Sequence, residues 1–470
     1  MRRTLIVLLL LLPLAAWGKS GYKITLQIDG SRDTMMLLCF YYANNERIAD
    51  TAYNDGKGYF VFEGDAELHP GLYFFTNNRN RYVEFVIYHE KPFFKFHTDD
   101  RAWTMNMSVK GSKQNEVFYN YQRASEALYR EIEDRKGELD SAALATFVAQ
   151  QHQRIDSLKI DFIARYPDAM ICKMMASTKD IEVPTEDADG KTMSQWERYE
   201  YMMAHYFDNM PLDDDFMVRT PKAVFYQRVM DYVEKYMHGW PPDKICPLLD
   251  SLIDRSEPAK EVNKWLIYKL TDYFLQSNVM VYDEVYCHLV MRYFATGKAA
   301  EWFPPSAIDE NVERATKWER LLVGREAPEL ILFDTTHQAY SLHHMRGDYT
   351  LLVFWSPTCG HCREIIPDVY RVFEEYLDSL DITAFAILSE PSDGTIVKWK
   401  KFIADHGMTN RKWVNLNGAE ANVDWREVYD ITTTPQIYLI ENKTHTFVAK
   451  KLNANIFREI CKSLTKKSAQ

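Results

Sequence analysis

The spacing of apolar residues changes twice along this chain of 470 residues, and these changes limit the folds that it can adopt. From residue 22 to about residue 110, apolar residues recur at every second position between turns rich in Asn, Gly and Asp, as in β-strands. From about 115 to 322 they recur every three or four positions, as in amphipathic helices. From residue 324 onward, short apolar runs alternate with helical patterns, which indicates a mixed sheet covered by helices.

We therefore predict a multidomain protein. Residues 19–112 are expected to form an antiparallel β-sandwich or barrel, residues 113–322 an α-helical domain, and residues 323–470 an α/β domain. The apolar content of 46% is sufficient for sizeable cores, and the formal net charge is −11. Because no long basic run occurs, we expect no nucleic-acid partner. The sequence leaves the oligomeric state open.

The first 18 residues differ from the rest of the chain because positive charge precedes a short apolar run. Arg2 and Arg3 are followed by the apolar segment Leu5–Trp17, and small residues permit cleavage after Gly18. The run is too short to span a bilayer. We predict a cleaved secretory signal peptide over residues 1–18 and a periplasmic location. Since no cysteine lies near the cleavage position, a lipoprotein anchor is not expected.

Seven cysteines in so long an exported chain do not form a disulfide scaffold. Five of them are isolated in apolar segments, and we expect them to be small buried core residues. These five are Cys39, Cys172, Cys246, Cys287 and Cys461. The remaining pair, Cys359 and Cys362, forms a CGHC motif.

A CGHC motif fits a zinc site, a structural disulfide or a redox couple. A zinc site would need two more ligands of similar spacing, and no second such pair occurs. A disulfide within so short a loop would constrain little of the chain. The redox interpretation fits best, because Cys359 follows a buried strand and begins a helix, whose positive N-terminus stabilises a thiolate. His361 adds positive charge when protonated, and Cys362 lies one turn further on, where it can resolve a mixed disulfide.

The residues around this motif resemble the signature of the thioredoxin fold. The matching residues are Phe354, Trp355, Cys359, Gly360, Cys362 and Pro367. Pro435, in TTTPQIYLI, resembles the cis-proline that faces the dithiol in that fold. The resemblance implies catalytic roles for Cys359, Cys362 and His361. It also implies that Trp355, Thr434 and Pro435 bind substrate, with Thr434 presenting its backbone to an extended substrate strand.

The resemblance extends over residues 324–466 and is specific to one exported bacterial branch. The separation of 73 positions from Cys362 to Pro435 fits the insertion of TlpA/ResA-like proteins. The β-rich start and the helical middle part resemble uncharacterised domains that precede such thioredoxin domains. Two departures occur: Val353 stands where many thioredoxins have a buried aspartate, and the central Gly-His dipeptide is that of protein disulfide isomerases.

These features predict a periplasmic thiol–disulfide oxidoreductase that reduces or isomerises disulfides of exported proteins. It would receive electrons from an upstream membrane or periplasmic thiol donor, without a cofactor or metal, and residues 19–322 would position substrates and do no chemistry. One alternative is a peroxiredoxin-like thiol peroxidase, for which Ser356 fits but Leu352 replaces the expected proline. Another is a surface protein that binds a partner or glycan and has an accessory redox domain.

Overall fold

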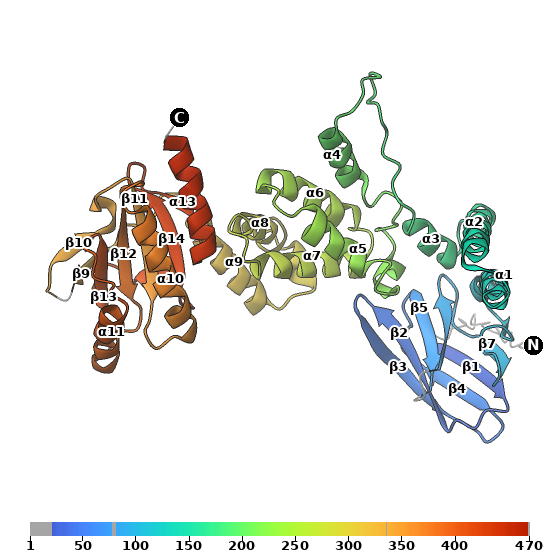
Figure 1. Cartoon of the computed structure of the whole chain (residues 1–470). Coiled ribbons are helices and arrows are strands. Elements are labelled where there is room, and N and C mark those ends of the chain that lie inside the picture. Colours follow the sequence, from blue (N-terminus) through green and yellow to red (C-terminus); the bar gives the residue numbers. More distant parts are fainter. Residues whose placement is uncertain (1–20, 78–80, 335, 469–470) are drawn as a thin grey trace, which may run out of the picture. The chain divides into compact units, whose positions relative to one another are not determined.

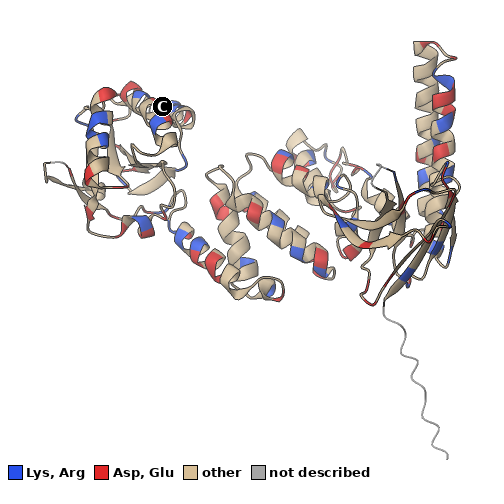
Figure 2. Cartoon of the chain, turned by 90° about the horizontal axis from the view of Figure 1, so that it is seen from below, with Lys and Arg blue, Asp and Glu red and all other residues tan. Residues whose placement is uncertain are grey.

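The computed structural model describes residues 21–77, 81–334 and 336–468. The predicted signal peptide therefore lies outside the described residues. Within them, no helix is both long and apolar enough to cross a membrane. Lys and Arg are interspersed with Asp and Glu along the helices (Figure 2).

The chain divides into two compact units, and each takes part of the predicted helical domain. One unit comprises Met1–His238 and Ser251–Asn263, and the other Gly239–Asp250 and Lys264–Gln470. The helical residues from 264 to 322 therefore belong to the same unit as the C-terminal sheet, although the sequence predicts a domain boundary at residue 322.

The N-terminal part is β-rich, as predicted. Two four-stranded sheets have the orders β4-β1-β7-β8 and β3-β2-β5-β6. Aromatic side chains fill the core, with Phe75 packed on Phe85 at 4.6 Å between ring centroids. The strands are β1 (Tyr22–Asp29), β2 (Met35–Tyr42), β3 (Asn45–Tyr53), β4 (Tyr59–Gly64), β5 (Gly71–Thr76), β6 (Tyr82–Ile87), β7 (Lys95–Asp99) and β8 (Ser108–Lys110).

One strand pair departs from the expected antiparallel arrangement. Strands β1 and β7 are parallel, with Leu26 opposite Phe96. Because β6 and β7 lie in different sheets, the chain crosses between the sheets and enters beside β1 in the same direction. The alternating apolar pattern does not extend to β3, whose polar residues in NERIADTAY are mostly exposed.

Helices occupy the middle of the chain, as the apolar spacing predicts. Two of the α-helices, α5 and α8, continue directly into π-helical turns, Tyr232–Tyr236 and Val290–Phe294. The α-helices are α1 (Lys113–Arg135), α2 (Ser141–Arg165), α3 (Met170–Ser177), α4 (Gln195–His205), α5 (Tyr226–Asp231), α6 (Pro242–Arg255), α7 (Lys260–Leu275), α8 (Tyr282–Leu289) and α9 (Pro305–Glu319).

The C-terminal part forms a seven-stranded mixed sheet of order β10-β9-β13-β12-β11-β14-β15 (Figure 1). Strands β11 and β12 are parallel and joined by α10, whereas β14 is antiparallel to both β11 and β15. This βαβ unit followed by a ββα unit is the thioredoxin fold, as predicted. The elements are β9 (Ile331–Asp334), β10 (Ala339–Ser341), β11 (Tyr349–Trp355), α10 (Gly360–Tyr376), β12 (Ile382–Leu388), α11 (Asp393–Asp405), β13 (Trp413–Ala421), α12 (Trp425–Val428), β14 (Gln436–Glu441), β15 (Thr446–Ala449) and α13 (Ala454–Ser468).

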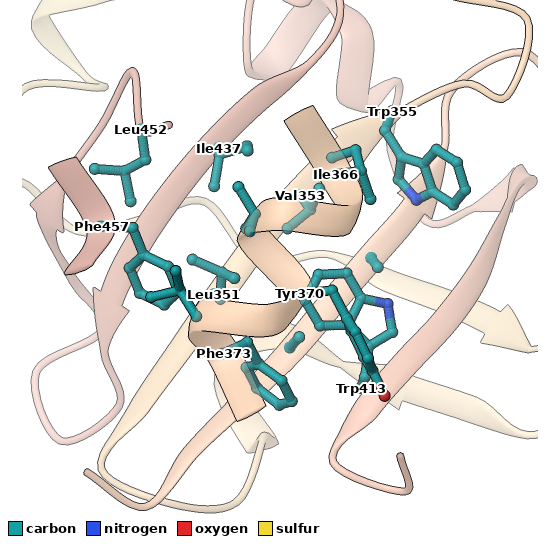
Figure 3. Packing of buried hydrophobic residues seen from close by; sticks show 14 of the residues in the cluster. Leu351, Val353, Trp355, Ile366, Tyr370, Phe373, Trp413, Ile437, Leu452 and Phe457 are labelled. Atoms are coloured by element: carbon teal, nitrogen blue, oxygen red, sulfur yellow. The ribbon is translucent and has the colours of Figure 1, made fainter. Parts of the chain in front are cut away.

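Strand β11 is buried on both faces of this sheet, as its continuous apolar sequence predicts. Leu351, Val353 and Trp355 belong to the core on one face, together with side chains of α10, α11 and α13 (Figure 3). Leu352 and Phe354 belong to the core on the other face. Burial on both sides fixes the end of β11, from which the CGHC motif follows.

Candidate active site

The CGHC motif lies where β11 passes into α10. Cys359 is the N-cap of the helix, and its sulfur accepts a hydrogen bond from the backbone N–H of Cys362 at 3.4 Å. The first turn of a helix has unpaired N–H groups and partial positive charge, which both favour a thiolate. The position of Cys359 at the helix start, predicted from sequence, is confirmed.

The surroundings of Cys359 favour its thiolate. Partial burial raises the pKa of the Cys359 thiol, but hydrogen bonds from the backbone N–H and thiol of Cys362, from Thr434 and from the backbone N–H of His361 outweigh it, so the pKa lies below its usual value. The thiol also lies 3.2 Å from the carbonyl oxygen of Thr434, to which it donates. A lowered pKa increases the share of thiolate, which is the nucleophilic form of cysteine, and partial exposure makes it accessible.

Cys362 has the opposite surroundings. It is fully buried, and the backbone N–H of Ser356 donates to its sulfur at 3.5 Å. Burial raises the pKa of the Cys362 thiol to about 12. Both cysteines are free thiols in the structure. The two thiols thus differ in exposure and in the direction of their pKa shifts, as expected for an attacking and a resolving cysteine.

Thr434 and Pro435 lie directly before β14 and are joined by a cis peptide bond. The register of β14 places Gln436 opposite Phe354, which brings the preceding two residues to the end of β11. Cys359, Thr434 and Pro435 therefore meet at one edge of the sheet, as the sequence predicts.

The predicted substrate contact of Trp355 is wrong. Its side chain is fully buried and packs on Phe402 at 5.2 Å between ring centroids, because β11 is covered on both faces. Residue 355 is thus part of the core that supports the motif. His361 is exposed, and a hydrogen bond from its backbone N–H lowers the pKa of Cys359.

A carboxylate that sequence analysis did not identify lies beside the motif. The Glu390 carboxylate accepts hydrogen bonds from the hydroxyl groups of Ser356 at 3.1 Å and Thr358 at 2.9 Å. Strands β11 and β12 are parallel, with Trp355 opposite Leu388, so the residues that follow them meet at one edge. Glu390 comes two residues after the end of the buried strand ITAFAIL, and this position in the sequence is the signal that could have identified it.

The other five cysteines are buried, as predicted. Burial raises the pKa of the Cys39 and Cys172 thiols to about 11 and that of the Cys246, Cys287 and Cys461 thiols to about 12. Thiols of this kind are poor nucleophiles at neutral pH. Cys359 is therefore distinct among the seven.

Comparison with protein families divides the chain into three matched parts. Residues 22–118 match a domain of unknown function (DUF4369), residues 152–317 match a second (DUF5106), and residues 323–444 match the AhpC/TSA family. The last match contains the CGHC motif and the Thr434–Pro435 pair.

Characterised relatives match part of the chain. This chain is 26% identical over 121 residues to the thioredoxin-like protein YneN of Bacillus subtilis, and the match covers 26% of this chain and 66% of that protein. It is 23% identical over 90 residues to the thiol-disulfide oxidoreductase ResA of Bacillus anthracis, covering 19% of this chain and 50% of that protein. The chain thus spans between half and about two thirds of the length of these relatives.

Among solved structures, a thioredoxin-like protein from Bacteroides caccae is 18% identical, with a TM-score of 0.49. The match covers 61% of this chain and 99% of that one. Residues 323–444 thus match the AhpC/TSA family, and the chain has homologues named thioredoxin-like protein and thiol-disulfide oxidoreductase.

Proposed function

We propose that this protein is a periplasmic thiol–disulfide oxidoreductase that uses the CGHC dithiol to reduce or isomerise disulfides in exported proteins. The observation that carries the proposal is the contrast between Cys359, partly exposed with a lowered pKa, and Cys362, buried with a raised one. The predicted signal peptide over residues 1–18 supports the location.

The proposed reduction proceeds in two exchanges. The Cys359 thiolate attacks one sulfur of the substrate disulfide; that S–S bond breaks, the leaving sulfur takes up a proton, and a mixed disulfide forms. Cys362 then loses its proton and attacks the Cys359 sulfur. The mixed disulfide breaks, and the substrate leaves as a dithiol after its second sulfur takes up a proton. The protein has given two electrons to the substrate and keeps a Cys359–Cys362 disulfide until an upstream thiol donor reduces it.

Thr434 and Pro435 would hold the substrate while this exchange occurs. The Thr434 carbonyl lies 3.2 Å from the Cys359 sulfur, so a peptide aligned along this backbone would place its disulfide beside the nucleophile. Backbone pairing is largely independent of side chains, which suits an enzyme that acts on many exported proteins.

The test is insulin reduction by the full mature chain and by its Cys359→Ser and Cys362→Ser variants. We expect both variants to be inactive in turnover, and Cys362→Ser to accumulate mixed disulfides in cells, because attack still occurs but resolution does not. Rapid hydrogen peroxide consumption without insulin reduction would instead support a peroxidase. Ser356, the residue that fits this alternative, donates its hydroxyl hydrogen to the Glu390 carboxylate in the structure.

A further inference from the structure

Trp318 lies near the end of α9 and contacts a loop of the thioredoxin domain. Its indole Nε1–H donates to the Asp430 carboxylate at 2.6 Å. Both residues belong to the unit that contains the C-terminal sheet. A hydrogen bond to a charged acceptor is stronger than one between neutral groups, so this contact is a substantial anchor for the loop.

Asp430 begins the segment that leads to Thr434. It follows α12 with a positive φ of 49°, a conformation that aspartate tolerates better than most residues. The backbone N–H of Ile431 donates to the Arg426 carbonyl at 2.8 Å, and that of Thr432 donates to the Asp430 carbonyl at 3.1 Å. The position of Asp430 therefore sets the direction in which the chain leaves α12 towards Thr434.

The ring of Trp318 also lies near a second segment, residues 450–452, which adjoins strand β14. The ammonium nitrogens of Lys450 and Lys451 lie 5.8 and 5.5 Å from the ring centroid, within the range of cation–π attraction. The next residue, Leu452, donates its backbone N–H to the Ile437 carbonyl at 3.3 Å, two residues after Pro435. Trp318 thus contacts the segment that precedes Thr434–Pro435 and also a segment that is hydrogen-bonded to β14, the strand that follows this pair.

We infer that Trp318 is a positioning residue for the proposed redox site, which holds the 430–434 loop so that Thr434 meets both Cys359 and the substrate backbone. The inference rests on the proposed function and extends it to the helical part of the chain, which would take part in substrate binding without contacting the substrate. Trp318 lies outside the matched ranges 152–317 and 323–444, in the segment between them.

Substrates of different size separate this role from a general one. Attack on a small disulfide such as 5,5′-dithiobis(2-nitrobenzoate) needs the Cys359 thiolate, whereas insulin must also pair with the Thr434 backbone. In the full mature chain, Trp318→Phe keeps an aromatic ring and removes the N–H. We expect its KM for insulin to rise roughly three- to tenfold, from the loss of about one hydrogen bond of loop anchoring. The rate with the small disulfide should stay within about twofold of wild type.

Two further comparisons make the test specific. Lys317→Gln is the matched control, because the neighbouring Lys317 also bridges α9 to α12, through Glu427 at 2.7 Å, but does not contact the loop. It should leave both substrates unaffected. Asp430→Gly, which permits the positive φ and removes the acceptor, should reproduce Trp318→Phe, whereas Asp430→Asn should keep the wild-type KM because its amide oxygen still accepts the indole N–H. This pair decides the matter even if Trp318→Phe does not fold.

An unchanged KM for insulin in Trp318→Phe and Asp430→Gly would overturn the inference. The inference would also be overturned if the variants lost activity equally with insulin and with the small disulfide, or if Lys317→Gln raised the KM for insulin as much as Trp318→Phe does. Either result would indicate a general loss of structure. Failure of the proposed function gives a different result, because the wild-type chain would then not reduce insulin, or insulin reduction would survive in Cys359→Ser.

Discussion

Asp283 and Lys450 form a buried ion pair at 2.6 Å, with 1% and 6% of their side chains exposed. Lys451 joins the same carboxylate at 2.6 Å. Lys450 also donates to the Leu321 carbonyl at 3.1 Å, and Lys451 to the Ser277 carbonyl at 2.6 Å. The ion pairs thus join α8 to the bend after β15, which explains why α8 belongs to the same unit as the C-terminal sheet.

Asp283→Ala should lower the free energy of unfolding of the C-terminal unit by about 3–5 kcal/mol, because it leaves buried ammonium groups without a counter-charge. Urea unfolding of the full chain measures this. The control is Glu375→Ala, whose partner Arg458 lies at 3.2 Å in a half-exposed pair. Exposed pairs contribute about 0–1 kcal/mol, so the control should lose little. Equal losses would show that the Asp283 pairs are no more stabilising than surface pairs.

The pattern of apolar residues was sufficient to predict a mixed sheet covered by helices and the buried strand before the dithiol, whereas the family resemblance identified this sheet as a thioredoxin fold. A strand buried on both faces must carry a continuous apolar run, and YTLLVFW has one. The helix start at Cys359 is also a local property. Because Thr434 and Pro435 are far from Cys359 in sequence, only the family resemblance placed them beside it.

Contacts between distant segments had no local signal. Asp283 and Lys450 are 167 positions apart, and neither differs in its sequence surroundings from a surface residue. The parallel pairing of β1 with β7 depends on how the chain crosses between sheets. Trp355 was given a binding role because the signature contains it, although burial on both faces of β11 excludes surface contact.

Cys359 should be alkylated before any other cysteine at mildly acidic pH. Its pKa is lowered by the helix start and its neighbours, whereas burial raises the pKa of Cys362 to about 12. Iodoacetamide labelling of the reduced protein at about pH 6, mapped by mass spectrometry, measures the order; rates follow thiolate content. Preferential labelling of Cys362, Cys39 or Cys461 would contradict the assignment.

The stability of the reduced protein should rise with pH in the range just below the ordinary cysteine pKa. Between the lowered pKa of folded Cys359 and the value near 8.5 of the unfolded chain, the unfolded state binds more protons, so raising the pH favours folding. This stabilisation is lost as the pH falls through the folded-state pKa. Cys359→Ser should lack the rise, which urea unfolding from about pH 5 to pH 8.5 would show. Parallel curves for the two proteins would refute the lowered pKa.

Export should remove the first residues of the chain. The positive start and short apolar run predict cleavage after Gly18 and release into the periplasm. N-terminal sequencing of the protein from fractionated cells measures this. An intact Met1 in the membrane fraction would indicate an anchor instead.

His361 should make the couple more oxidising than a thioredoxin with proline at this position. Positive charge near Cys359 stabilises the thiolate, which exists only in the reduced form, so reduction becomes easier. Typical potentials are about −270 mV for thioredoxin and about −180 mV for the isomerase, a difference of roughly 90 mV or 4 kcal/mol. We therefore expect an intermediate potential, and His361→Pro should make it more negative and raise the pKa of Cys359.

Two variants separate the backbone N–H of His361 from its ring. The backbone N–H of His361 lowers the pKa of Cys359, and proline would remove this N–H together with the ring. His361→Ala removes the ring alone. Redox titration against glutathione should give potentials in the order wild type, His361→Ala, His361→Pro, from least to most negative. If His361→Ala matches wild type while His361→Pro falls, the N–H is the tuning group; if neither variant shifts, the helix terminus and Thr434 set the potential.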